Sequence, residues 1–268
     1  MTQTEMGLRA GPYEAVAEAL AGTPFASITY AEETESTNAD AAALLGDERY
    51  GGCVLVAEYQ SRGAGRKGRT WLAPAGSALL FTTILPRAIE TEALWVVPYW
   101  VALAVRNALL DCGIKTTVKW PNDLLLHDRK LAGVLCQSSV SGRAAHVACG
   151  VGINVRRPGA DPGIAPPPAF CDDVAVIDRA ALLRAILTEY DRSLITLDQP
   201  ARVAAAWDEA AGLPGKPYRI RLDGEPESFN AIAEGLDPGG GLRVIRENGR
   251  REIISLADAT VVRQAQGR

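Results

Sequence analysis

The sequence predicts an α+β protein in which a larger domain is followed by a small β-barrel. Three strand-like segments with short links indicate a meander in the larger domain, at residues 116–120, 130–139 and 145–155. Apolar patterns with helical spacing flank this meander at residues 94–111, 179–197 and 201–211. After Gly212 the pattern changes to short alternating segments separated by turn pairs such as Asn248-Gly249, and closing such a sheet on itself removes its exposed edges.

Two helices are expected before the meander. The first lies around residues 12–21. The second follows the loop in ESTNADAAALLGDE, residues 35–48, because Ser36 or Thr37 can cap a helix there and Asp40 completes a T-x-x-D capping pattern.

Two apolar runs, residues 53–59 and 78–85, predict buried strands that are joined by a loop rich in glycine and arginine. Residues 156–173 contain five prolines and predict a long loop. Taken with the change of pattern at Gly212, these elements predict two domains, residues 1–212 and residues 213–268.

Composition indicates an ordinary folded protein and limits what it binds. Hydrophobic residues make up 47% and charged residues 22% of the chain, far from the composition of a disordered protein. The net charge of −4 argues against a protein that coats nucleic acid, because neutralising phosphates needs a broad basic surface. Any ligand of the basic loop is therefore expected to be small.

Cysteine, histidine and hydropathy patterns predict a cytoplasmic protein. The cysteines are odd in number and none has C-x-x-C spacing, so neither a disulfide framework nor a zinc site is indicated. His127 and His146 are too few for a histidine-based metal cluster. The N-terminus lacks the pattern of a secretion signal, and the longest apolar run, residues 93–105, is too short to span a bilayer.

The sequence SRGAGRKGRTW, residues 61–71, is called the basic loop from here on. Its glycines allow close approach of the backbone to a ligand, and its arginines carry forked donors that suit carboxylates and phosphates. The alternative is a solvated charged hairpin. The glycine spacing is not that of a phosphate-binding P-loop, and a strand follows where a dinucleotide-binding fold would begin a helix.

Two further motifs each allow a functional and a structural interpretation. In VKWPNDLLLHDRKLAG, residues 118–133, several polar and charged side chains surround a turn at Pro121, and the same letters also describe a simple turn with a surface lysine. In GVGINV, residues 150–155, two glycines and Asn154 interrupt an apolar run, which indicates either close approach to a ligand or a bulge.

Together the motifs resemble those of the biotin protein ligases, in the order ESTN, AEYQSRGAGRKGRTW, KWPND with RKLAGVL, and GVGINV. The resemblance runs from about residue 34 to residue 155, and the strand-rich tail looks like the family's SH3-like barrel. It implies a catalytic domain related to class II aminoacyl-tRNA synthetases, with a mixed, largely antiparallel sheet and flanking helices. It also implies an activity: biotinyl-5′-AMP is made from biotin and ATP with magnesium, and biotin is then transferred to a lysine of a carboxylase carrier domain.

The resemblance implies three overlapping sets of site residues. The biotin pocket would be formed by Ser36, Thr37, Asn38, Gln60, Gly63, Gly65, Arg66 and Lys130. The adenylate would contact Arg66, Arg69, Trp71, Asn122, Lys130 and Asn154. The catalytic residues would be Lys130, Arg66, Arg69, Lys119 and Asp123. No residue is assigned to a metal, since magnesium is expected mainly on the ATP phosphates.

The chemistry of these steps agrees with the residue types. Attack of a carboxylate on a phosphate polyanion needs nearby cations to cancel repulsion in the transition state. The product is a mixed anhydride that water destroys, so a glycine-containing loop that closes over it is useful. In the second step a group that accepts or orients protons of the attacking lysine is needed, and Asp123 is the candidate, with Lys119 stabilising developing charge.

One position departs from the family's G-R-G-R-x-G-R pattern, because Ala64 replaces an arginine. Weaker retention of biotin or the adenylate follows unless Arg62 or Lys67 substitutes for the missing charge. The short segment before ESTN predicts a ligase without the DNA-binding domain that some relatives carry.

The expected partner is a biotin carboxyl carrier domain, with no DNA and no membrane, and the protein is expected to be a monomer or homodimer. The sequence leaves two alternative functions open. One is a lipoate or octanoate ligase or transferase of the same fold, and the other is a biotin-adenylate sensor that does not modify carriers.

Overall fold

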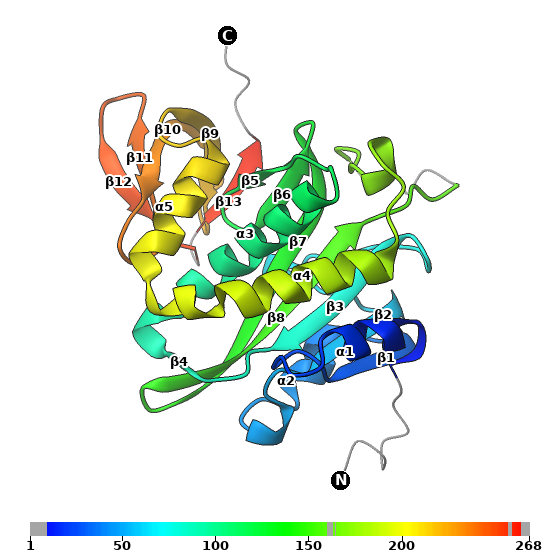
Figure 1. Cartoon of the computed structure of the whole chain (residues 1–268). Helices are drawn as coiled ribbons and strands as arrows, with labels where there is room; N and C mark the ends of the chain where they lie inside the picture. The colour runs from blue at the N-terminus through cyan, green and yellow to red at the C-terminus, as the bar shows by residue number, and fades with distance from the viewer. Residues whose placement is uncertain (1–9, 160–162, 164, 257–258, 264–268) are drawn as a thin grey trace.

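The computed structural model describes residues 10–159, 163, 165–256 and 259–263, which form two β-sheets with helices packed around the larger one (Figure 1). The predicted proline-rich loop is present as irregular structure at residues 156–159 and 165–170, and residues 160–162 and 164 of that loop lie outside the described residues.

The larger sheet has eight strands and is mostly antiparallel, as predicted. Its order is β1-β2-β3-β8-β7-β6-β5, and β4 pairs with β8 outside this order. The strands β1 and β2 pair in parallel. The bounds are β1 (Ile28–Thr34), β2 (Val54–Gln60), β3 (Ala78–Ile84), β4 (Ile89–Glu90), β5 (Thr117–Lys119), β6 (Asp123–Leu126), β7 (Arg129–Ser141) and β8 (Ala144–Asn154). Neither β1 nor β6 was predicted as a strand.

Five helices surround this sheet: α1 (Glu14–Ala19), α2 (Thr37–Ala42), α3 (Val96–Asp111), α4 (Arg179–Ser193) and α5 (Pro200–Ala211). The helix α3 is mostly apolar and largely buried, because it packs on β5 to β8 with α4 beside it on the same face of the sheet (Figure 1). Pro98 lies in its first turn, where the missing N–H costs no hydrogen bond, and therefore does not break the helix. Within the described residues no helix is long and apolar enough to cross a membrane.

Alternation along β8 separates the two faces of the sheet. Val147, Cys149, Val151 and Ile153 belong to the main core, which is covered by α3 and α4. Gly150 and Gly152 point to the opposite face, where α2 packs against β2, β3, β7 and β8. This second face holds the functional cavity described below.

The smaller sheet has five strands in the order β12-β11-β10-β9-β13. The bounds are β9 (Lys216–Leu222), β10 (Phe229–Leu236), β11 (Leu242–Arg246), β12 (Arg251–Ile254) and β13 (Ala259–Arg263). Its buried residues, among them Tyr218 and Val244, join the same apolar cluster as Trp207 of α5. The small sheet is thus fixed to the rest of the protein by a continuous core.

Candidate active site

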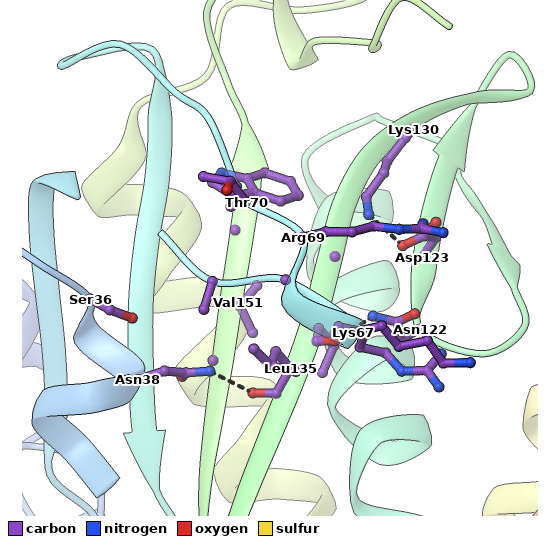
Figure 2. A pocket seen from close by; sticks show the side chains of 18 of the residues that line it. Ser36, Asn38, Lys67, Arg69, Thr70, Asn122, Asp123, Lys130, Leu135 and Val151 are labelled. Atoms are coloured by element: carbon purple, nitrogen blue, oxygen red, sulfur yellow. Dashed lines mark hydrogen bonds and ion pairs between the residues drawn. The ribbon is translucent and has the colours of Figure 1, made fainter. Parts of the chain in front are cut away.

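A cavity of about 160 Å³ opens on the second face of the large sheet, beneath the basic loop. Figure 2 shows Ser36 and Asn38 on one side of it, and Arg69, Asp123 and Lys130 on the other. Its lining comes from the start of α2, the end of β2, the basic loop, β3, the β5–β6 turn, the first half of β7 and the last part of β8: Ser36, Thr37, Asn38, Gln60, Ala64, Gly65, Arg66, Lys67, Arg69, Thr70, Trp71, Phe81, Lys119, Trp120, Pro121, Asn122, Asp123, Lys130, Gly133, Val134, Leu135, Gly150, Val151 and Gly152.

The charged end of the cavity is organised by strand register. Lys119 pairs with Asp123, Asp123 with Gly133, and Gly133 with Gly152, across β5, β6, β7 and β8. Residues directly opposite one another in a sheet point to the same face. One row across four strands therefore presents a lysine, a carboxylate and two glycines to the cavity.

A β-bulge in β7 turns Lys130 toward this row. On β6, Leu124 pairs with Ala132 and the next residue, Leu125, pairs with Lys130. Leu131 is therefore an extra residue on β7. Leu131 and Ala132 are both fully buried in the main core, although they are neighbours. Without the bulge, simple alternation would send Lys130 to the core side with Ala132.

Lys130 forms an ion pair with Asp123, with 2.7 Å between Nζ and Oδ1. Its ammonium group also lies 5.4 Å from the centre of the Trp71 ring, within the range of a cation–π interaction. Burial lowers the pKa of Lys119 below its ordinary value, Lys130 and Arg69 lower it further, and Asp123 opposes them. A single carboxylate therefore serves several cations at this end of the cavity.

The glycines form a floor on which Trp71 lies. A side chain at Gly152 would begin 2.6 Å from the indole of Trp71, and one at Gly133 would begin 3.3 Å from it. The Nε1 atom of Trp71 is buried and has no hydrogen-bond partner among the described residues. The two glycines thus leave room for an aromatic surface, as the sequence pattern GVGINV allowed, and they are not part of a bulge in β8.

The other end of the cavity is neutral and strongly hydrogen-bonded. Asn38 Nδ2 donates to the Leu135 carbonyl at 3.0 Å, and Asn38 Oδ1 lies 2.7 Å from the Thr82 hydroxyl. Because a carbonyl only accepts, this pattern fixes the orientation of the Asn38 amide. The main-chain N–H of Thr37 donates to Gln60 Oε1 at 2.7 Å, which leaves Gln60 Nε2 on the side of the basic loop.

The room for Asn38 comes from Gly150. A side chain at Gly150 would begin 2.0 Å from Asn38 Oδ1. The Asn38 side chain cannot move away from this clash while it stays bonded to the Leu135 carbonyl. The two glycines of β8 therefore have separate tasks. Gly150 makes room for the neutral end and Gly152 for the aromatic floor of the charged end.

The basic loop closes on itself above the cavity. Trp71 N–H donates to the Gly63 carbonyl at 2.8 Å, and Gly65 N–H donates to the Arg69 carbonyl at 2.7 Å. These bonds hold a short turn, Arg66–Gly68, at the tip of the loop. Burial lowers the pKa of the Arg66 guanidinium below its ordinary value, and Asp123 partly offsets the effect.

Comparisons with known proteins identify the family of this chain. The Biotin/lipoate A/B protein ligase family matches residues 30–154. A biotin–[acetyl-CoA-carboxylase] ligase of Paracoccus denitrificans is 34% identical over 236 residues, which cover 84% of this chain and 96% of the relative. The chain belongs to the biotin/lipoate A/B protein ligase family.

Two further known proteins are similar to this chain over most of its length. A biotin–[acetyl-CoA-carboxylase] ligase of Mycobacterium tuberculosis is 30% identical over 256 residues, covering 91% of this chain and 92% of the relative. The crystal structure of a biotin protein ligase from Aquifex aeolicus with biotin and ATP has a TM-score of 0.71 at 22% identity, covering 89% of this chain and 99% of that one. At that identity the structural likeness concerns the fold.

Most of the site residues that were predicted from the sequence are found in the lining of the cavity. The exceptions are Gly63 and Asn154. Gly63 lies at the stem of the basic loop, where a side chain would begin 2.5 Å from the Trp71 carbonyl. Asn154 is buried behind the cavity, and its Nδ2 donates to the Ala169 carbonyl at 3.1 Å.

Asn122 lines the cavity and also has a structural partner, because its Nδ2 donates to the Val134 carbonyl at 2.6 Å. Thr82 was not singled out from the sequence, although it links Thr37 and Asn38. No motif marks Thr82, since it lies within an apolar strand, and only its register opposite Gly150 reveals its position.

Neither basic residue proposed to replace the arginine missing at Ala64 is free for that purpose. Arg62 lies 3.2 Å from Glu35 in an exposed ion pair. Lys67 lies 2.6 Å from Asp223 of the C-terminal sheet. Ala64 itself forms an isolated bridge with Thr70, so its main chain helps to close the basic loop.

Among the described residues no group of three or more His, Cys, Asp or Glu side chains is arranged to hold a metal ion. Asp123 is the carboxylate in the cavity lining, and it is paired with Lys130. The donor set therefore does not form a protein site for magnesium, which prefers several oxygen ligands.

Proposed function

We propose that this protein is a biotin–[biotin carboxyl-carrier protein] ligase, which activates biotin with ATP as biotinyl-5′-AMP and then transfers biotin to a lysine of a carrier domain. The observation that carries this proposal is the joining of a neutral, hydrogen-bonding end and a cationic end in one cavity beneath the basic loop. The names of the Paracoccus and Mycobacterium relatives give the same activity.

The neutral end suits the ureido ring of biotin. This ring carries amide-like donors and an acceptor but no charge, and it therefore fits hydroxyl and amide side chains. In the proposal Ser36, Thr37, Asn38 and Gln60 receive it. The bonds from Thr37 to Gln60 and from Asn38 to Leu135 hold two of these side chains in place before the ligand arrives.

The charged end suits the first chemical step. The carboxylate of biotin attacks the α-phosphorus of ATP, a new C–O–P linkage forms, and pyrophosphate leaves. Lys130, Arg66 and Arg69 offset the repulsion between the carboxylate and the phosphates, and their effect is greatest where negative charge accumulates in the transition state. Trp71 offers a flat apolar surface and a buried Nε1 donor to the adenylate.

In the second step the amine of the carrier lysine attacks the acyl carbon. An amide bond forms, the bond between the acyl group and phosphate breaks, AMP leaves, and the amine gives up a proton. Asp123 is proposed to orient the amine and accept that proton, with Lys119 beside it stabilising the developing charge. The proposed adenylate contacts also include Arg69 and Asn122. Asn154 belongs to the same set, but it acts indirectly by holding the strand that carries Lys130.

Magnesium enters this proposal with ATP. The cavity lacks a set of carboxylates of its own, so the ion would be held mainly by phosphate oxygens. Its contribution is neutralisation of phosphate charge during the first step.

The finer features of the fold belong to the same proposal. The large sheet with its helices is proposed to be related to class II aminoacyl-tRNA synthetases, and the five-stranded sheet to be an SH3-like barrel, with domains at residues 1–212 and 213–268. The pairing of the last strand, β13, with the first, β9, supports this interpretation because it brings the two ends of the segment together. A cytoplasmic protein without a DNA-binding role, acting as a monomer or homodimer, completes the proposal.

A direct test mixes the purified protein with ATP, magnesium, biotin and a biotin carboxyl carrier domain, and measures the intact mass of the carrier. The expected result is the addition of one biotinyl group, which is lost when the acceptor lysine is replaced by arginine. Addition of a lipoyl or octanoyl group in parallel reactions, in place of biotin, would instead identify the related acyl ligases. Formation of biotinyl-5′-AMP without any modified carrier would identify a sensor.

A further inference from the structure

The tip of the basic loop is held from outside by the C-terminal sheet. Lys67 Nζ lies 2.6 Å from both carboxylate oxygens of Asp223, which directly follows β9. The Arg66 guanidinium donates to the main-chain carbonyl of Leu256, which lies just beyond β12. Two residues of the loop that lines the cavity are thus bonded to residues about 150 to 190 positions later in the chain.

The backbone of the tip indicates why an outside contact is useful. Lys67 has a φ of 56°, a left-handed conformation that is unfavourable for a residue with a side chain, and Gly68 follows with a φ of 70°. Two of the bonds within the loop join its stem, at Gly63 with Trp71 and at Gly65 with Arg69, and one longer bond of 3.2 Å crosses the tip, from the Arg69 N–H to the Arg66 carbonyl. The ion pair of the Lys67 side chain therefore stabilises a conformation of the tip that is unfavourable for the main chain of Lys67.

We propose that Asp223 is a positioning residue, which latches the basic loop over the cavity through Lys67 and so retains the acyl adenylate between the two steps. This inference rests on the proposed function and deepens it. Asp223 acts through Lys67 on the nearby residues Arg66 and Arg69, which are the proposed phosphate contacts. Loss of the latch leaves the chemistry possible and shortens the time for which the adenylate stays bound.

The attachment of the C-terminal sheet does not depend on this latch. The hydroxyl of Tyr99, in α3, donates to the Gly240 carbonyl at 2.5 Å, and Trp120 Nε1 donates to Tyr99 at 3.0 Å. Tyr218 and Val244 of the small sheet lie in the main apolar core. Breaking the pair between Lys67 and Asp223 should therefore loosen the tip of the loop, which keeps the bond from Arg66 to Leu256, without undocking the sheet.

The expected effect is modest because the latch is partly solvated. The side chain of Lys67 is 26% exposed and that of Asp223 is 53% exposed. Exposed ion pairs of this kind change equilibria by about two- to five-fold, and salt weakens them further. The release rate of the adenylate is thus expected to rise by about two- to five-fold when the pair is broken.

The test measures release of preformed biotinyl-5′-AMP from the full-length protein, by chasing the complex with excess biotin and ATP analogue and following tryptophan fluorescence. Wild type is compared with Asp223→Asn, Lys67→Met and the double variant. Asp198→Asn is the matched control, because Asp198 forms a 2.7 Å ion pair with Arg87 and is also 53% exposed, on a surface away from the cavity lining.

The latch predicts faster release in both single variants, no further increase in the double variant, and no change in Asp198→Asn. Asp223→Glu should restore slow release, and high salt should accelerate release more in wild type than in Asp223→Asn, because only the phosphate contacts remain to be screened in the variant. Equal release from wild type and Asp223→Asn would overturn the latch while leaving the proposed function intact. If the wild-type protein did not bind biotinyl-5′-AMP at all, the proposed function itself would fail.

Discussion

Lys130 Nζ lies 2.7 Å from Asp123 Oδ1, and these two residues are proposed to act in different steps. Lys130 is needed most when the phosphate and carboxylate come together, whereas Asp123 is needed when the acceptor amine loses a proton.

Replacing each partner should therefore affect one step more than the other. Asp123→Asn is expected to lower transfer to the carrier by about 10²-fold or more, the usual range for losing a general base. Formation of biotinyl-5′-AMP should fall by a smaller factor. Lys130→Met should give the reverse order, and single-turnover measurements of AMP-biotin and of biotinylated carrier separate the two. Equal losses in both steps would contradict the division of roles.

Gly152→Ala should displace Trp71 from the floor of the cavity. The new methyl group would lie 2.6 Å from the indole, so the ring must move. We expect weaker binding of ATP, measured by calorimetry, with the biotin affinity changed less. Gly159→Ala is the matched control, since a side chain at that exposed glycine meets nothing within 4 Å. Unchanged ATP affinity in Gly152→Ala would remove Trp71 from the proposed adenylate contacts.

Thr82→Val tests the network at the neutral end. The substitution keeps the shape but leaves Asn38 Oδ1 without its donor, at a cost of about 1–3 kcal/mol for an unsatisfied buried group. We expect a lower unfolding free energy and a raised KM for biotin. Thr83→Val, one residue later, is the control, because the Thr83 hydroxyl is buried and has no hydrogen-bond partner within the described part of the chain, so its removal should not destabilise the protein. Similar biotin KM values for both variants would argue against this network.

The lowered pKa of Lys119 predicts a pH-dependent stability difference. A lysine whose pKa is lower in the folded than in the unfolded protein destabilises the fold while it is protonated, and this cost disappears as the pH rises through the window between the two pKa values. Lys119→Met should therefore unfold at higher denaturant concentration than wild type at pH 7. The difference should narrow as the pH rises toward the ordinary lysine pKa of 10.5, and transfer activity should be lost. A constant difference across this range would contradict burial as the cause.

The main elements of the fold could be predicted because their patterns are local. The apolar helix α3 and the alternating strand β8 appear directly in the sequence. The strands β1 and β6 could not be predicted in the same way. The strand β6 is short, and β1 is only partly buried along its length, so each is defined by its partner, β1 by its parallel pairing with β2 and β6 by its position between β5 and β7.

Much of the candidate site could be predicted from its motifs, while its geometry could not. The bulge at Leu131, which turns Lys130 toward the cavity, depends on pairing between β6 and β7 and has no marker in the sequence. Asp223 is equally hidden, since it looks like an ordinary turn residue before Gly224. Both depend on contacts between segments that lie far apart or pair irregularly, which local patterns do not encode.

The most direct measurement is a crystal structure of the protein with a stable analogue of biotinyl-5′-AMP. The account predicts that the ureido ring lies beside Thr37 and Gln60, and that the phosphate lies within hydrogen-bond distance of Lys130 or Arg69, beneath a closed basic loop. A ring bound outside this cavity, or a basic loop directed into solvent above a bound adenylate, would contradict it.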